Sequence, residues 1–216
     1  MFKKLLATLL LASSFNVFAA PQIGQDFDKT AQPIATENPS KIEVNEIFWY
    51  GCIHCYHMDP VLETWAKKLP ADVTFKRTPG LPNPSWAPMA KAFYTLEELK
   101  LFSKLHMPLF DAVHKQKNLN PTDEKAIIDW ITRQAGVDKA KVEEHFKSFS
   151  MNNKLNRAAK TFKDSGATGV PSLVIDGQYI TSSTMTGGNQ QALAVADYII
   201  ANIRADKAKV AAPAKK

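Results

Sequence analysis

The order in which strand and helix patterns follow one another constrains this fold more than any other sequence feature. Residues 41–50 first alternate and then run apolar, which is typical of a buried strand. A helical spacing of apolar side chains follows over 52–69, and a second alternating strand follows over 72–78. Strand, helix and strand within about forty residues predict a βαβ unit with parallel strands.

The pattern then changes twice. Apolar side chains recur at helical spacing throughout 83–165, and Gly166 is placed to end the last of these helices. Beyond this block the turn Asp176-Gly177 joins two short strands, which is a strong hairpin signal, and a final helix follows over 188–203. We therefore predict an α/β fold of the thioredoxin type, interrupted by an inserted all-helical domain.

The first twenty residues differ from the rest of the chain. Two positive charges, Lys3 and Lys4, precede a short apolar run over 5–18, and two alanines follow. This pattern predicts a secretory signal peptide, cleaved after Ala19 because small or aliphatic residues then stand at −3 and −1. The run is too short to span a membrane, although an uncleaved anchor is the alternative. The mature protein is expected in an exported, oxidising compartment.

These patterns predict four parts. We expect a signal peptide over 1–19, a thioredoxin-like domain over 20–80 and 166–205, a helical insertion over 81–165, and a flexible basic tail over 206–216. Lys and Arg outnumber Asp and Glu by 27 to 21 in the whole chain, a formal net charge of +6. Because the basic residues are spread out and are not interleaved with aromatic residues, nucleic-acid binding is not expected.

The chain has only two cysteines, Cys52 and Cys55, which enclose Ile53-His54 where a strand ends and a helix begins. At a helix N-terminus the unpaired backbone N–H groups favour a thiolate, so this position predicts a redox-active dithiol. A zinc site that also used His54 and His57 is disfavoured, because four ligands so close in sequence cannot converge from one helical turn. A structural disulfide is disfavoured as well, because so short a loop removes little chain entropy.

Two further side chains near the cysteines are candidates for the chemistry. His54 lies beside the predicted thiolate, where even a partial positive charge stabilises the anion. Glu46 stands in an otherwise apolar strand. If it faces inward, it is a buried carboxylate with a raised pKa, suited to proton transfer; if it faces outward, it is an ordinary strand-start residue. His57 is interpreted as exposed helix surface.

A constrained turn precedes the predicted hairpin. Gly166, Gly169 and Pro171 lie close together, and Pro171 stands at the first position of a strand, where proline is tolerated. X–Pro bonds are cis in only about 5–6% of folded cases, so the local sequence alone does not predict a cis bond between Val170 and Pro171.

Together these motifs resemble the DsbA family of bacterial periplasmic thiol-disulfide oxidoreductases. The resemblance is carried by Glu46, by the run Phe48-Trp-Tyr-Gly-Cys-Ile-His-Cys and by Gly169-Val-Pro171. It implies a thioredoxin fold, a cis peptide at Val170–Pro171 and a buried acid at Glu46. It also implies Cys52 as the exposed nucleophile and Cys55 as the buried resolving thiol. The chain departs from the best-known members at Ile53, where they carry proline.

The resemblance implies a dithiol oxidase that introduces disulfides into exported proteins through Cys52 and Cys55, with Val170 and Pro171 binding the substrate chain. The expected partners are unfolded or reduced exported proteins and a quinone-linked, DsbB-like reoxidant in the inner membrane. No cofactor or metal is expected, and the protein is expected to be a periplasmic monomer. The alternatives are a periplasmic disulfide reductase or isomerase, which usually needs a separate dimerisation domain, and a non-catalytic thioredoxin-like binding module.

Overall fold

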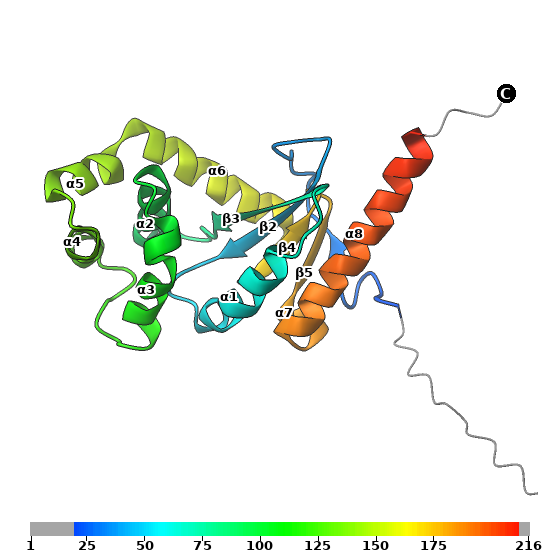
Figure 1. The fold of residues 1–216 in the computed structure, drawn as a ribbon, viewed down its shortest axis with the longest axis horizontal. Helices are drawn as coiled ribbons and strands as arrows, with labels where there is room; N and C mark the ends of the chain where they lie inside the picture. The colour runs from blue at the N-terminus through cyan, green and yellow to red at the C-terminus, as the bar shows by residue number, and fades with distance from the viewer. Residues whose placement is uncertain (1–19, 212–216) are drawn as a thin grey trace, which may run out of the picture.

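A computed structural model describes residues 20–211 of the chain (Figure 1). The strands are β1 (Asp28–Lys29), β2 (Ile42–Phe48), β3 (Val73–Pro79), β4 (Ser172–Ile175) and β5 (Tyr179–Ser182). The helices are α1 (Ile53–Ala66), α2 (Ala87–Glu98), α3 (Phe102–His114), α4 (Glu124–Ala135), α5 (Lys139–Lys147), α6 (Phe149–Ser165), α7 (Ser183–Thr186) and α8 (Asn189–Ala211), with a 3-10 turn over Pro84–Trp86 before α2.

The strands form one mixed sheet in the order β1-β5-β4-β2-β3. β2 pairs in parallel with β3, and α1 connects them, as the βαβ pattern predicts. β4 pairs antiparallel with β2 and with β5. Asp176 and Gly177 both have positive φ angles, 51° and 65°, which is the geometry of the tight hairpin turn that the sequence predicts. The thioredoxin-type fold with a helical insertion is confirmed.

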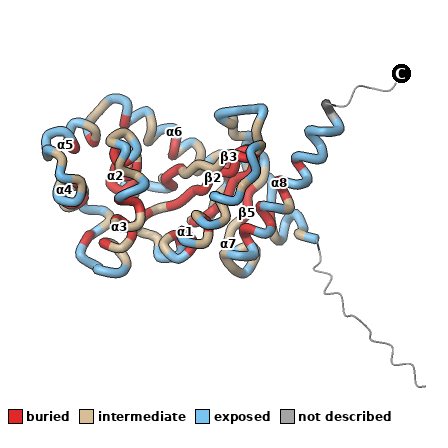
Figure 2. The backbone as a smooth tube through the Cα atoms, in the orientation of Figure 1, coloured by how far each residue is buried: buried red, intermediate tan, exposed pale blue. Residues whose placement is uncertain are grey.

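β2 is buried along its whole length because helices cover both faces of the sheet at its centre. On one face, Val44 belongs to a core that includes Leu62 of α1 and Ile199 of α8. On the other face, Ile47 packs with Phe162 of α6. Figure 2 shows the buried backbone concentrated in the sheet and on the inward sides of the helices. Side chains of β2 therefore contribute to the cores on both faces of the sheet.

The helices α2 to α6 form a block at one end of the sheet (Figure 1). Its core joins the end of β2 to the helices through Phe48, whose ring lies 5.4 Å from that of Phe93. Asp138 caps α5 by accepting from Ala140 N, and Gly166 ends α6 with a φ of 73°. This core also contains the buried Cys55, so the helical block contributes one wall of the cysteine site.

The structure differs from the sequence prediction at the C-terminal end. α8 continues to Ala211, so the flexible tail predicted from residue 206 is wrong over 206–211. Alanine and lysine are strong helix formers, and Lys207 of this segment pairs with Asp176 at 3.1 Å. The rest of the tail, 212–216, and the signal peptide predicted over 1–19 lie outside the described residues. Within the described part, no helix is long and apolar enough to cross a membrane.

One strand has no counterpart in the sequence prediction. β1 pairs antiparallel with β5, with Asp28 beside Ile180, although the polar residues around it show no strand periodicity. Phe27 is buried beside it, with its ring 5.9 Å from that of Tyr179. Tertiary pairing to an existing edge decides this strand, because local propensity does not.

Candidate active site

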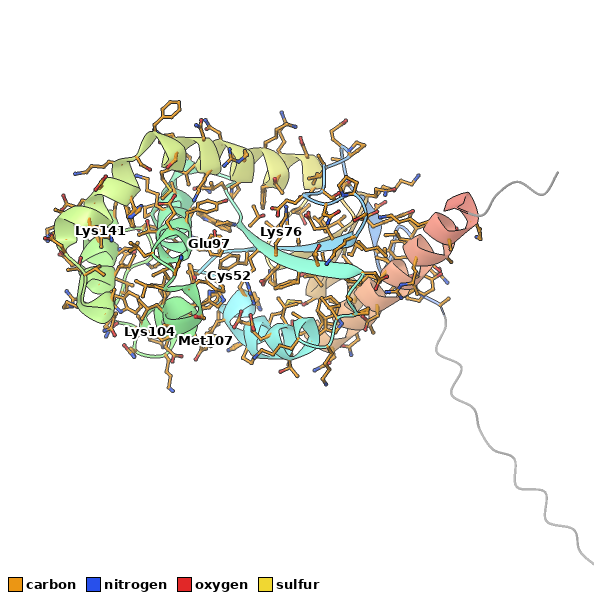
Figure 3. All side chains as sticks on the ribbon, turned by 45° about the horizontal axis from the view of Figure 1, so that its top comes forward. Cys52, Lys76, Glu97, Lys104, Met107 and Lys141 are labelled. Carbon is orange, nitrogen blue, oxygen red and sulfur yellow. The ribbon has the colours of Figure 1, made fainter. Side chains whose placement is uncertain are left out.

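The two cysteines stand where the loop after β2 enters α1, and Figure 3 labels the first of them, Cys52. Cys52 is the N-cap residue of α1, with extended backbone angles of φ −94° and ψ 116°. Its sulfur is partly exposed, whereas Cys55, one turn into the helix, is fully buried. Both thiols are free in the structure. The strand-to-helix position that the sequence predicts for the pair is therefore observed.

The surroundings of the Cys52 sulfur favour its thiolate. The Cys55 thiol donates a hydrogen bond to it, and the backbone N–H groups of Cys55 and His54 add two more. These donors outweigh the cost of burial and lower the pKa of Cys52 from 9.0 to about 6. The charge of the His54 side chain acts in the same direction and contributes least. Near neutral pH the outer sulfur is therefore mostly in the nucleophilic form.

The inner sulfur behaves in the opposite way. Burial raises the pKa of Cys55 well above 9.0, and the hydrogen bond to Cys52 and the charges of Cys52 and Glu46 raise it further. The proton of the pair therefore stays on Cys55. This asymmetry allows the outer sulfur to exchange with other thiols while the inner one is kept from solvent.

The loop before β4 lies against the outer sulfur. The Cys52 sulfur lies 3.3 Å from the backbone oxygen of Val170, to which it donates when it is protonated, although the two residues are 118 positions apart in sequence. The Val170–Pro171 peptide bond is cis, as the family resemblance implies. Val170 is partly buried and Pro171 is buried. The fold thus brings the two sequence-predicted substrate-binding residues beside the predicted nucleophile.

A cluster of buried charges lies below the cysteines. Arg77 of β3 donates from Nε to Glu46 Oε2 at 2.8 Å and from Nη2 to Asp59 Oδ1 at 2.9 Å. The same Nη2 is 2.8 Å from Glu63 Oε1. The side chains of Glu46 and Asp59 are each 2% exposed and that of Arg77 is 6% exposed. Glu46 therefore faces inward, which resolves the alternative that the sequence left open.

One guanidinium cannot neutralise three neighbouring carboxylates. The pKa of Glu46 is raised as a result. Burial raises the pKa of Glu46 from 4.5 to about 7; Arg77 opposes this rise and the charge of Asp59 supports it. For Asp59 burial acts in the same direction, but hydrogen bonds from His106 and Arg77 hold its pKa below 3.8. Glu46 is therefore the carboxyl group of the cluster whose pKa lies closest to neutral pH.

The sequence analysis did not identify three of these residues as part of the site: Arg77, Asp59 and His106. His106 of α3 is buried between two partners, with Nε2 2.9 Å from Asp59 Oδ1 and Nδ1 2.6 Å from the Tyr50 hydroxyl. A neutral imidazole meets both contacts, since the Tyr50 hydroxyl can donate to Nδ1 while Nε2–H donates to Asp59. Burial lowers the pKa of His106, which agrees with a neutral ring.

A sequence signal was present for one of them. Arg77 occupies the inward-facing position of its strand that Val73 and Phe75 occupy earlier, so an arginine stands where the alternation calls for an apolar side chain. Such a residue needs a buried acid as partner, and Glu46 is directly opposite it in the β2–β3 register. No comparable signal marks Asp59 or His106.

The two histidines near the cysteines are exposed. His54 contributes to the site through its backbone N–H and through its charge, while His57 lies on the helix surface as interpreted from the sequence. Within residues 20–211, no group of three or more His, Cys, Asp or Glu side chains is arranged to hold a metal ion.

Comparisons with known proteins agree with this geometry. The family model of the DSBA-like thioredoxin domain matches residues 55–199. The thiol:disulfide interchange protein DsbA of Burkholderia cepacia is 37% identical to this chain, over 95% of this chain and 99% of that protein. The protein of the same name from Pseudomonas aeruginosa is 36% identical, over 93% of this chain and 96% of that protein.

Solved structures show the same likeness in three dimensions. The crystal structure of Pseudomonas aeruginosa DsbA superposes with a TM-score of 0.80 at 34% identity, covering 87% of this chain and 96% of that one. The oxidoreductase DsbA of Xylella fastidiosa superposes with a TM-score of 0.78 at 25% identity, covering 86% and 98%. With a family model that matches most of its length and relatives of this identity over nearly all of it, the chain belongs to the DsbA family of thiol:disulfide oxidoreductases.

Proposed function

We propose that this protein is a dithiol oxidase that donates the Cys52–Cys55 disulfide to exported proteins. The observation that carries the proposal is the asymmetry of the pair, with the pKa of Cys52 lowered to about 6 and that of the buried Cys55 raised. Stabilising the thiolate stabilises the reduced enzyme, and a stable reduced enzyme means an oxidising disulfide. The position of the pair in a DsbA-family chain supports the same direction.

The reaction begins with the oxidised enzyme, whose two sulfurs are joined. A substrate thiolate attacks the Cys52 sulfur, the Cys52–Cys55 bond breaks, and Cys55 leaves as a thiolate. The second substrate thiolate then attacks the substrate sulfur of the mixed disulfide, and Cys52 leaves as a stabilised thiolate. The substrate has lost two electrons and gained a disulfide, and the enzyme has gained both electrons.

Glu46 is suited to supply a proton at the first step. The departing Cys55 thiolate is buried, so it must be protonated quickly, and its own pKa is high. Glu46 has a pKa of about 7, and its charge raises the pKa of Cys55. A neutral Glu46 can release a proton toward Cys55 and then remain as a carboxylate beside Arg77. The reverse transfer serves reoxidation.

The cis-proline loop is suited to hold the substrate chain. In the oxidised enzyme Cys52 has no thiol proton to donate to the Val170 oxygen, and within the described residues the Val170 N–H donates no hydrogen bond. An extended peptide can therefore pair with this backbone and place its cysteine at the Cys52 sulfur. Main-chain hydrogen bonds depend little on the side chains of the substrate. The substrates would therefore be unfolded exported proteins of varied sequence.

We also propose that the protein is a periplasmic monomer, exported by residues 1–19 and reoxidised by a quinone-linked, DsbB-like membrane protein. A reductase or isomerase is the second candidate, since the relatives' name specifies only thiol:disulfide interchange.

Two measurements distinguish the candidates. Equilibrating the mature protein with glutathione buffers should yield a reduction potential above about −200 mV, against the roughly −270 mV of a reducing thioredoxin. The oxidised protein should also convert a reduced two-cysteine peptide to its disulfide stoichiometrically. A potential near the thioredoxin value would support the reductase, and retention of function in Cys52→Ser would support a binding module.

A further inference from the structure

A cavity of about 750 Å³ opens on the face of the sheet opposite the cysteine site. Its walls are residues 33–37 of the N-terminal arm, strands β2 and β3, and helices α2 and α6. Neighbouring side chains of a strand point to opposite faces, so Asn45 faces this cavity while Glu46 faces the cysteines. A volume of this size lies within the range of small-ligand sites. The proposed exchange reaction uses none of the walls except Arg77.

The inner end of the cavity carries an unpartnered amide. Asn45 is 3% exposed and lines the cavity, and its side-chain oxygen is buried without a hydrogen-bond partner. Its side-chain nitrogen donates to no atom of the described residues either. A buried amide left in this way costs free energy, so a ligand that pairs with it is favoured. The oxygen is closed off from the cavity, so a ligand can reach only the side-chain nitrogen, which is a donor that a peptide carbonyl matches.

The charges around the cavity are mostly neutralised within the protein. Lys76 pairs with Glu37 at 3.1 Å and with Glu43 at 3.0 Å. Lys154 pairs with Glu98 at 2.7 Å and lies over the ring of Tyr94. Lys160 pairs with Asp164. Because these three lysines have acidic partners, they leave no cluster of free positive charge for a bare anion such as phosphate.

Two charges of opposite sign remain without an ion-pair partner among the described residues. They are Glu97 of α2 and Arg157 of α6, and the charges of both act on Tyr94 from within the cavity wall. Burial raises the pKa of Glu97 and the charge of Lys154 only partly opposes this rise, so a further cation beside this carboxylate would be favourable. Figure 3 labels Glu97 on α2 and Lys76 on β3, two of the elements that line the cavity.

We propose that this cavity binds a short peptide with free termini. The α-ammonium group of the peptide pairs with Glu97, its carboxylate pairs with Arg157, and a peptide carbonyl between them accepts a hydrogen bond from the side-chain nitrogen of Asn45. Aliphatic side chains of the peptide fit the apolar part of the wall, which includes Ile34 and Ala158. This site is separate from the peptide-pairing surface at Val170, and its ligand undergoes no thiol exchange.

The test is a titration of the reduced, ¹⁵N-labelled mature protein with trialanine, followed by NMR. We expect saturable shifts of the Asn45 side-chain amide and of the backbone around Glu97 and Arg157. Glu97→Gln and Arg157→Ala should each weaken binding about tenfold, because each removes a charged hydrogen-bonding partner. Trialanine that is N-acetylated and C-amidated should bind the wild-type protein at least tenfold more weakly than free trialanine does, because both of its terminal charges are removed.

Matched controls remove the same charges elsewhere on the surface. Arg133→Ala and Glu144→Gln, at exposed positions of α4 and α5, should leave the affinity unchanged. Absence of saturable shifts, equal binding of the capped peptide, or unchanged affinity in both cavity variants would overturn the proposal. Shifts centred on Cys52 and Val170 would overturn it as well, because they would place trialanine at the exchange site instead.

Discussion

The cysteine site has an outer region, called the mouth, and a buried region, called the floor, and the two shift the pKa of an acidic group in opposite directions. At the mouth, formed by Cys52, His54 and Val170, backbone N–H groups and a neighbouring thiol stabilise a negative sulfur and lower its pKa to about 6. At the floor, formed by Glu46, Asp59 and Arg77, burial removes water and raises the pKa of Glu46 to about 7. A thiol and a carboxylic acid, whose ordinary pKa values differ by several units, thus titrate close together.

The mouth owes its effect first to the hydrogen bond from the Cys55 thiol and then to the backbone N–H groups at the start of α1, all of which lie within four residues of chain. The floor owes its effect to three elements, β2, β3 and α1, that bring excess negative charge to one arginine. Because the pKa of Glu46 is about 7 and that of Cys55 is well above 9.0, proton transfer from Glu46 to a departing Cys55 thiolate is favourable.

The largest expected effect comes from removing the mouth's sulfur. Cys52→Ser should lower the rate of peptide oxidation by about 10³-fold or more, because no other sulfur is accessible to a substrate thiolate. Cys55→Ser should instead accumulate a mixed disulfide at Cys52, detectable by intact mass after reaction with an activated disulfide peptide. Substantial oxidation by Cys52→Ser, or trapping at position 55, would reverse the assignment of the two sulfurs.

Neutralising the floor should act mainly through pH. In Glu46→Gln, oxidation at pH 7 should fall about tenfold, and any inflection near pH 7 in the rate profile should disappear. Glu43→Gln is the matched control, since Glu43 is also buried in β2 but faces Lys76 on the other side of the sheet. If both variants keep the wild-type profile, Glu46 is not the proton donor.

The floor also makes a signed prediction for stability. The folded pKa of Glu46 is raised, so its contribution to folding is complete below about pH 4.5 and is lost as the pH rises through 7. The free energy of unfolding of Glu46→Gln, relative to that of wild type, should therefore rise by about 2 kcal/mol between pH 5 and pH 8. Urea denaturation at several pH values measures this difference. A stability difference that does not change with pH would mean that Glu46 is ionised throughout.

The lowered pKa of Cys52 at the mouth predicts a pH dependence of stability that is opposite in sign to that of Glu46. The folded pKa of Cys52 is depressed, so the stabilisation of the reduced protein is complete above the unfolded value near 9 and shrinks as the pH falls through 6. The stability of the reduced form relative to the oxidised form should therefore rise by about 1 kcal/mol between pH 5 and pH 7, after discounting for the partial exposure of Cys52. Denaturant melts of both redox forms at the two pH values check this, and a difference that does not change with pH would contradict the lowered pKa of Cys52 on which the oxidase proposal rests.

The smallest effect is expected at His54. His54→Ala keeps the backbone N–H and removes only the last and weakest of the influences on Cys52, so alkylation of Cys52 at pH 5.5 should slow about twofold. His57→Ala, exposed one turn further on, should leave the rate unchanged. A tenfold effect of His54→Ala would mean that the side chain, and not the helix start, controls the thiolate.

The sequence by itself determined the order of the elements and the place of the cysteine pair. Periodicity identified β2, β3 and the helical block, and the Asp176-Gly177 turn identified the hairpin, because these depend on interactions between residues near in sequence. It also determined that Cys52 begins a helix, and the family resemblance supplied the cis bond at Pro171 and the acid at Glu46.

Only the tertiary structure decided which way Glu46 faces and which residues surround it. Asp59, Arg77 and His106 come from α1, β3 and α3, and their distances to Glu46 and Tyr50 depend on how those elements pack. The pairing of β1 with β5 and the extension of α8 to Ala211 were also decided there. The pKa of a buried carboxylate is set by desolvation and by charges distant in sequence, and neither quantity exists until the chain has folded.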